Sequence, residues 1–158
     1  MIKQMHASEE SHDSHPMAAW CLVMTEGTSF ALPVSLITAI CQVRTLTPLP
    51  QSHASVCGAT NHHGTPLIVI APFPVLQSGL TLTLGWMPAF AVVFDQRELD
   101  LDADAEIAYG FGIDQGLDTC RAQPQIVGDD LIIFHNGERI RAYDRQRLRA
   151  RLTTLFPT

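Results

Sequence analysis

The stretch from residue 46 to residue 70 most constrains what this chain can fold into, because it reads only as extended backbone and turns. Pro48 and Pro50 exclude a helix at its start and push their neighbours toward extended backbone. Residues 61–64, Asn-His-His-Gly, are typical of a hairpin turn, since the closing glycine tolerates positive φ. Residues 67–70 are apolar, rich in β-branched side chains and too short for a helix. The sequence therefore predicts a β-hairpin here.

Two further turns each separate a pair of strand-like runs. Glu26-Gly27-Thr28 predicts a tight hairpin with a three-residue turn. Asn136-Gly137 is the dipeptide preferred in a two-residue type I′ turn. The flanking strands are expected at residues 20–24 and 29–32 for the first turn, and at residues 131–135 and 138–143 for the second.

Apolar spacing predicts two short helices. Pro33 suits a first helical position, and Val34, Ile37 and Ile40 follow at helical spacing. Asp144 is a good N-cap for a C-terminal amphipathic helix. The apolar face of this second helix comprises Leu148, Leu152, Leu155 and Phe156, and its outer face carries Arg145, Arg147, Arg149 and Arg151.

Three more runs predict strands, at residues 81–84, 89–94 and 108–113. Residues 71–74 break the preceding strand with two prolines, and residues 121–124 are expected to form a loop. The total is eight or nine short strands and two short helices, a pattern typical of a mostly-β barrel or sandwich.

Composition limits the classes of function. The 158 residues match the size of one domain, which we expect at 17–156 after a flexible polar tail at 1–16. Charged residues make up only 16%, against about a quarter in an average chain, so apolar surface is expected to remain for a protein partner. The net charge of −6 argues against nucleic-acid binding. No run reaches the roughly 18 apolar residues of a membrane span, and the N-terminus has no signal-peptide core, so we expect a cytoplasmic protein without membrane insertion.

The acidic segment at 98–106 resembles the start of a calcium loop. Asp100, Asp102 and Asp104 have the right spacing, but the sixth and twelfth positions of such a loop hold Ala105 and Phe111 in place of glycine and glutamate. We therefore interpret the segment as an acidic, solvated loop.

Four side chains near the central hairpin are candidate metal ligands or a Cys-His nucleophile pair: His53, Cys57, His62 and His63. Adjacent histidines on extended backbone point to opposite faces, and no nearby carboxylate would orient an imidazole. We expect no metal and no cofactor. A small β-barrel that senses a ligand or metal through Cys57, His62 and His63 stays open as the alternative.

Nothing in the sequence indicates catalysis. The chain contains no G-x-S-x-G nucleophile elbow, no P-loop and no dinucleotide-binding glycine pattern. The four cysteines are scattered without a CxxC pair, and we expect them to be reduced. The arginines of the C-terminal helix could bind a phosphate, a membrane or an acidic protein patch, but we favour the interpretation of a solvated helix face.

The central stretch resembles the core signature of the CheW-like domain, the coupling fold of bacterial chemotaxis. The resemblance fades between residues 79 and 127. It rests on Leu46-Thr47-Pro48-Leu49-Pro50, Val56-x-Gly58, Asn61-x-x-Gly64 and Ile68-Val69-Ile70, and upstream on Phe30-Ala31-Leu32-Pro33-Val34 and Ile37-x-x-Ile40.

This resemblance implies two small SH3-like five-stranded β-barrels that share a hydrophobic core, with short helices that include a C-terminal one. It also implies a non-enzymatic adaptor that couples chemoreceptors to a histidine kinase. The implied partners are the kinase's CheW-like regulatory domain, the cytoplasmic tips of chemoreceptors and other CheW-like adaptors.

By the same resemblance, the partner-binding positions are Gly58, Asn61, His63 and Gly64. The family has an arginine where this chain has His63, and histidine offers neither a forked set of donors nor a permanent charge. Further family polar positions are replaced by Ala39, Ile68 and Ala71. Positions that shape the fold are kept while polar contacts are lost, which indicates a diverged adaptor. An accessory role in a type IV pilus-linked or other non-flagellar system is one form this could take.

Overall fold

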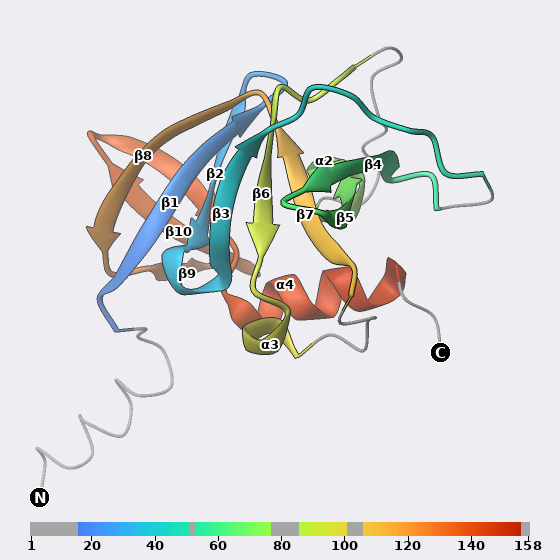
Figure 1. The fold of residues 1–158 in the computed structure, drawn as a ribbon. Coiled ribbons are helices and arrows are strands. Elements are labelled where there is room, and N and C mark those ends of the chain that lie inside the picture. Colours follow the sequence, from blue (N-terminus) through green and yellow to red (C-terminus); the bar gives the residue numbers. More distant parts are fainter. Residues whose placement is uncertain (1–15, 51–52, 77–85, 101–105, 156–158) are drawn as a thin grey trace, which may run out of the picture.

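A computed structural model describes residues 16–50, 53–76, 86–100 and 106–155. These residues form eleven strands in two sheets, with a few short helices around them (Figure 1). The strands are β1 (Ala18–Thr25), β2 (Thr28–Pro33), β3 (Ile37–Gln42), β4 (Val56–His62), β5 (Thr65–Ile70), β6 (Phe90–Phe94), β7 (Ala108–Ile113), β8 (Gln115–Ala122), β9 (Gln125–Val127), β10 (Asp130–His135) and β11 (Glu138–Ala142). The helices are η1 (Val34–Leu36), α2 (Pro72–Leu76), α3 (Gln96–Leu99), α4 (Arg145–Leu152) and η2 (Thr153–Leu155).

The first sheet combines the two ends of the described chain in the order β8-β1-β2-β11-β10-β9. Its two hairpins lie where the turn residues predicted them. Asn136 and Gly137 both have positive φ, at 51° and 78°, as a type I′ turn requires. The β1–β2 turn is shorter than expected, because Thr25 pairs with Thr28 and leaves a two-residue turn. β10 approaches β8 closely enough for His135 Nε2 to lie 3.8 Å from an Asp118 carboxylate oxygen, so the sheet curls.

The second sheet is built from the intervening residues in the order β3-β6-β7-β5-β4. The predicted strands at 67–70, 89–94 and 108–113 correspond to β5, β6 and β7. β4 and β5 form the central hairpin, and β5 then pairs in parallel with β7. The predicted strand at 81–84 lies outside the described residues, as do Asp102 and Asp104.

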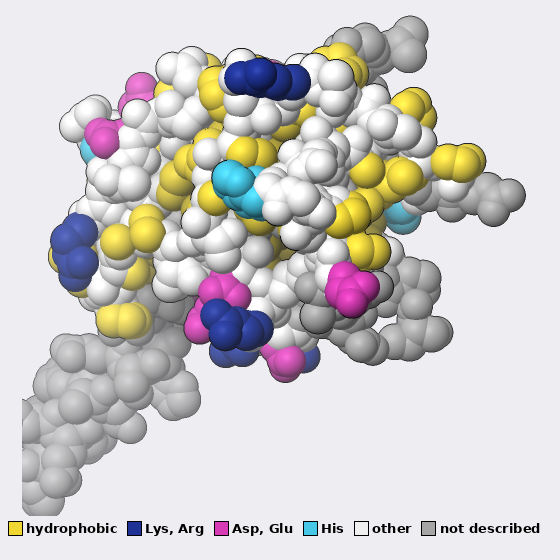
Figure 2. Space-filling model, in the orientation of Figure 1, with side chains coloured by type: hydrophobic (Ala, Val, Ile, Leu, Met, Phe, Trp, Pro, Cys, Tyr) yellow, Lys and Arg dark blue, Asp and Glu magenta, His cyan; other side chains and the backbone are white. Residues whose placement is uncertain are grey.

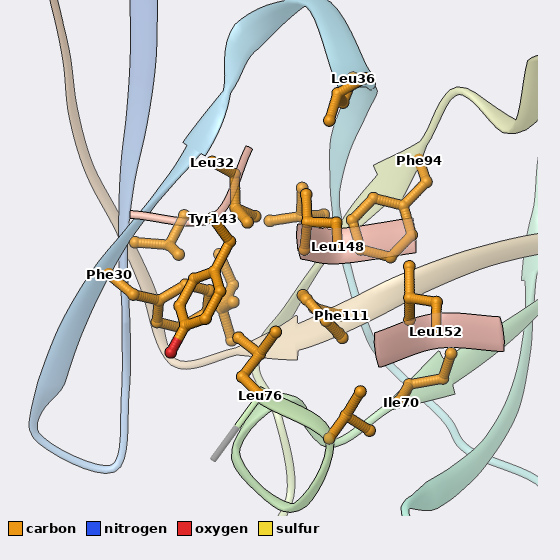
Figure 3. Packing of buried hydrophobic residues seen from close by; sticks show 14 of the residues in the cluster. Phe30, Leu32, Leu36, Ile70, Leu76, Phe94, Phe111, Tyr143, Leu148 and Leu152 are labelled. Atoms are coloured by element: carbon orange, nitrogen blue, oxygen red, sulfur yellow. The ribbon is translucent and has the colours of Figure 1, made fainter. Parts of the chain in front are cut away.

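An apolar seam joins the two sheets. Phe30 from β2, Phe111 from β7 and Leu148 from α4 are all fully buried within it. Phe111 meets Phe94 and Phe30 edge-on, with ring centroids 4.8 Å and 6.3 Å apart. Figure 3 shows how side chains from both sheets and from α4 converge on this seam. The expected mostly-β arrangement with a hydrophobic core common to both sheets is confirmed.

The helix expected from Pro33 to Ile40 is wrong. Only the short 3-10 turn η1 follows Pro33, and the chain then enters β3. Val34 and Ile40 are 39% and 45% exposed, so they do not bury a helical face. β3 pairs with β6, and that pairing, together with the β-branched isoleucines, outweighs the local helical spacing.

Three smaller differences concern segments without strong local signals. The exposed strand β8 was not anticipated, and it includes the first two residues of the loop expected at 121–124. The break after β5 is the short helix α2. The acidic segment begins inside α3, which ends at Leu99. The N-cap of this helix, Asp95, accepts hydrogen bonds from the backbone N–H groups of Arg97 and Glu98. The expected boundaries of the tail and the domain stay a prediction.

Helix α4 confirms the expected C-terminal helix, but it ends at Leu152; Leu155 lies in the 3-10 turn η2, and Phe156 lies outside the described residues. Asp144 caps α4 by accepting a hydrogen bond of 2.9 Å from the Arg147 backbone N–H. Leu148 and Leu152 are completely buried in the seam, while the arginines lie toward solvent. In Figure 1, α4 runs beneath both sheets. The helix therefore closes one end of the core.

We expect Leu148→Ala to lower the free energy of unfolding by about 2–5 kcal/mol, because it leaves a cavity at the seam. Equilibrium denaturation in urea would measure this. Gln146→Ala, an exposed change on the same helix, serves as the control and should alter stability by less than about 0.5 kcal/mol. Equal effects of the two changes would show that α4 does not anchor the core.

Candidate partner-binding site

The tip of the β4–β5 hairpin is an exposed two-residue turn. His63 and Gly64 occupy it with φ of 52° and 82°, a pair of positive values typical of a type I′ turn. The Asn61 side chain closes the turn, because its Oδ1 accepts a hydrogen bond of 2.8 Å from the Gly64 backbone N–H. Asn61, His63 and Gly64 are exposed. The tip is thus a fixed surface feature that presents an imidazole.

Gly58 lies apart from this tip, and the local backbone explains why this position holds a glycine. Its φ is 149°, and a β-carbon built there would lie 2.8 Å from the Thr47 carbonyl oxygen. Thr47 runs alongside β4 and exchanges two backbone hydrogen bonds with Ala59, of 2.8 Å and 2.9 Å. Gly58 is buried beneath this crossing. The structure therefore brings Asn61, His63 and Gly64 together and separates Gly58 from them. Their roles as partner contacts stay a prediction.

His62 and His63 have neighbouring rings but different surroundings. Their ring centroids are 4.5 Å apart, with 60° between the planes. His63 is exposed, whereas His62 is half-buried and lines a shallow hollow of ≈ 400 Å³ at the end of the second sheet. Figure 2 shows histidine side chains near the centre of this face, within uncharged and apolar surface.

Arg97 lines the same hollow as His62, and no motif in the sequence marks this arginine. Its side chain is 94% exposed, and its guanidinium lies 3.8 Å from an Asp95 oxygen. Asp95 is engaged in capping α3, so this ion pair is loose. The hollow therefore carries a positive charge from α3, after β6. The family's arginine position lies instead on the β4–β5 turn.

Cys57 does not join the histidines. It packs at the edge of the apolar cluster of the second sheet, and burial raises the pKa of its thiol to about 11. His53 Nδ1 accepts a hydrogen bond of 3.1 Å from the Ser55 backbone N–H instead. Within the described segments, no three His, Cys, Asp or Glu side chains are placed to hold a metal ion. The geometry gives the metal-sensing alternative no support.

Two further surfaces are open to a partner. The outer edge of β4 has no hydrogen-bonded strand beyond Ala59 among the residues that the structure describes. At the junction of the sheets, Ile40 and Leu117 are 45% and 41% exposed. A β-carbon on Gly116 would lie 3.8 Å from Ile40 Cδ1, so these strands are neighbours, and Leu117 sits at a bulge in β8 that turns it outward. We call Ile40, Gly116 and Leu117 the junction patch.

The arginines of α4 are partly neutralised by nearby acidic groups. Arg147 pairs with Asp144 at 2.9 Å, and Arg149 pairs with Asp100 at 3.3 Å. Arg145 donates from Nε to the Glu98 carbonyl oxygen. These contacts agree with the interpretation of a solvated helix face beside an acidic segment. No helix in the described ranges is long and apolar enough to cross a membrane.

Comparison with known proteins identifies the fold. No protein-family model matches the sequence, and no curated protein matches it. Among solved structures, the chain is similar to the crystal structure of scaffolding protein TtCheW from Thermoanaerobacter tengcongensis, with a TM-score of 0.57 and 11% sequence identity. The match covers 81% of this chain and 85% of that one. At this identity the similarity shows that the fold is CheW-like.

We expect Gly58→Ala to destabilise the protein by about 1–3 kcal/mol, because the new methyl group meets the Thr47 carbonyl oxygen and the residue keeps a positive φ. Urea denaturation would measure the change. Gly64→Asn is the matched control, since asparagine tolerates the left-handed region and the turn has open space. A larger loss for Gly64→Asn would contradict the assignment of Gly58 to the close crossing.

The raised pKa of Cys57 predicts slow alkylation of the folded protein at pH 8. With a pKa of about 11, about one thiol in a thousand is ionised at that pH, and only the thiolate reacts. The rate at Cys57, followed by peptide mass spectrometry with iodoacetamide, should rise as the pH approaches 11. The urea-unfolded protein, whose thiol has an ordinary pKa, should react much faster at pH 8. Rapid reaction of the folded protein at pH 8 would show a reactive cysteine.

Proposed function

We propose that this protein is a non-enzymatic adaptor of a chemosensory system, which couples chemoreceptors to a histidine kinase. The observation that supports this most is the CheW-like pairing of two sheets on one apolar seam, similar over most of its length to a scaffolding protein. The strand edge and hairpin tip of the second sheet are left available for a partner.

The kinase contact is proposed at the β4–β5 hairpin. An edge strand offers free backbone donors and acceptors, and a partner can extend the sheet through them. Among the described residues, the bridge on this edge joins Thr47 to Ala59, so we propose that the part of β4 nearest the tip pairs with the partner. We propose the CheW-like regulatory domain of the kinase as the partner here, with Asn61, His63 and Gly64 fixing its position.

The receptor contact is proposed at the junction patch. Ile40 and Leu117 are large, exposed and apolar, and they come from different sheets. Such residues are typical anchors of protein interfaces when polar groups surround them. A receptor tip that docks there would touch both halves of the fold at once.

His63 is proposed to alter partner choice. An arginine at the tip would donate a forked pair of hydrogen bonds to a carboxylate, which histidine cannot reproduce. Arg97 lines the same hollow as His62 and supplies a positive charge from the other side of the hairpin's surroundings, near Asp95. We infer that the adaptor prefers a kinase or receptor that places an acidic group against Arg97. We propose that this partner belongs to an accessory or non-flagellar system.

The direct test is the affinity for the CheW-like domain of the kinase encoded nearest to this gene, measured by titration calorimetry. We expect wild type to bind and His63→Arg to change the affinity by about tenfold or more, the effect of one charge-assisted hydrogen bond. Arg97→Gln should weaken wild-type binding by a similar factor.

Gln146→Arg is the charge-matched control, because it adds the same group on α4, away from the hairpin. It should leave the affinity unchanged. If neither wild type nor His63→Arg binds the kinase domain or receptor tips, the adaptor proposal is wrong. If both bind equally, the adaptor role stands but the tip is not the contact.

A further inference from the structure

Asp114 connects the two sheets, because it lies between β7 of the second sheet and β8 of the first. Its side chain is half-buried, and both of its carboxylate oxygens accept hydrogen bonds. Oδ2 accepts one of 2.6 Å from the Glu26 backbone N–H, and Oδ1 accepts one of 2.9 Å from Trp86 Nε1. Hydrogen bonds to an ionised acceptor are short and strong. Asp114 therefore holds two segments that are distant from it in the sequence.

The first of these contacts fixes the β1–β2 turn. Glu26 has a φ of 50°, in the left-handed region that residues other than glycine rarely adopt, and the carboxylate binds its N–H in that conformation. Nearby, the Asp114 backbone N–H donates to the Met24 carbonyl oxygen at 2.9 Å. Thr25 Oγ1 donates to the Gly112 carbonyl oxygen at 3.3 Å. Figure 1 shows the turn and the end of β7 at the same end of the molecule. This turn of the first sheet is thus bonded to β7 and to Asp114.

The second contact fixes the segment that leads into β6. Trp86 is half-buried and lies shortly before that strand. Ala89, in the same segment, donates its backbone N–H to the Ile113 carbonyl oxygen at 3.1 Å. The Ala89 carbonyl oxygen accepts a hydrogen bond of 2.9 Å from Val43, which follows β3. Trp86 therefore reaches Asp114 from a segment that is itself bonded to the end of β7 and to the chain after β3.

The junction patch lies on the strands that Asp114 holds. Gly116 and Leu117 follow Asp114 closely, at the start of β8. Ile40 is on β3 and pairs with Val92 of β6, the strand that the Trp86 segment enters. The spacing between Ile40 and Leu117 therefore depends on where β8 begins relative to the second sheet, and the Asp114 carboxylate fixes that point.

We propose that Asp114 is a positioning residue for the receptor contact, because it fixes the two sides of the junction patch relative to each other. This inference rests on the receptor contact proposed above and adds the residue that prepares it. A receptor tip docked on the patch touches both sheets, so any freedom of β8 relative to β3 is lost on binding. Order that already exists in the free adaptor removes this cost and raises the affinity. The kinase contact uses the β4–β5 hairpin of the second sheet and does not depend on Asp114.

Two variants and one control test this role. Asp114→Asn keeps the size of the side chain but turns an NH₂ group toward one of the two donors. Trp86→Phe removes only the indole donor and leaves the Glu26 hydrogen bond in place. Asp129→Asn makes the same change of charge in the exposed β9–β10 turn and is the matched control. Titration calorimetry uses two probes: a soluble cytoplasmic fragment of the chemoreceptor encoded nearest to this gene, and the CheW-like domain of the kinase.

We expect Asp114→Asn to weaken binding of the receptor fragment by about tenfold or more. Trp86→Phe should weaken it by a smaller factor, because only one of the two contacts is lost. Both variants should bind the kinase domain with the affinity of wild type, and Asp129→Asn should bind both probes as wild type does. If Asp114→Asn does not fold, Trp86→Phe decides the question, because it leaves the β1–β2 turn bonded.

The indole N–H resonances in NMR spectra give a readout that a general loss of stability would not produce. Trp86 Nε1 donates to Asp114, whereas Trp20 Nε1 donates to the Ala122 carbonyl oxygen at 3.2 Å within the first sheet. In Asp114→Asn, the Trp86 indole resonance and the backbone amides of the junction patch should shift. The Trp20 indole resonance should stay in place and serves as the internal reference.

The inference is overturned if Asp114→Asn binds the receptor fragment as wild type does, or if it weakens binding of both probes equally. It is also overturned if the Trp86 indole resonance does not move. Failure of the receptor contact itself looks different: wild type would then not bind the receptor fragment, and the inference would fall with that contact. If wild type and Asp114→Asn bind the fragment equally, the receptor contact stands and Asp114 has no part in it.

Discussion

Burial of the apolar seam between the two sheets is the interaction on which the rest of the structure depends. Phe30 and Phe111 come from opposite sheets and meet there, and Leu148 closes the seam from α4. Each sheet has an apolar face that only the other sheet covers, so neither sheet could bury that face alone. The positions of the hairpin tip and the junction patch follow from how this seam holds the sheets together.

Local turn chemistry could be predicted, but long-range pairing could not. The Asn136-Gly137 turn and the Asp144 cap depend on a few neighbouring residues, so the sequence predicts them correctly. The segment after Pro33 has helical spacing over a short run, yet it becomes β3 because β6, far along the chain, offers a partner. The CheW-like signature succeeded at 11% identity to the solved scaffold because it records backbone requirements, such as the one at Gly58.

The candidate site also contains residues that the sequence predicts and residues that it does not. Asn61 and Gly64 could be expected at a turn from sequence alone, and the structure places them there with His63 between them and exposed. Arg97 could not be anticipated, because nothing in its own segment marks it. It matters through the hollow that it lines together with His62. Residues of this kind become visible only when the tertiary neighbours are known.

The order of strands in the sheets has a consequence for synthesis on the ribosome. The second sheet uses one continuous stretch, from β3 to β7, while the first sheet is divided between the two ends of the described chain. β2 pairs in parallel with β11, which is made only after all the strands of the second sheet. The nascent chain therefore carries the β1–β2 hairpin with its apolar faces uncovered while the second sheet is already complete. A chaperone that shields the β1–β2 hairpin would act during that interval.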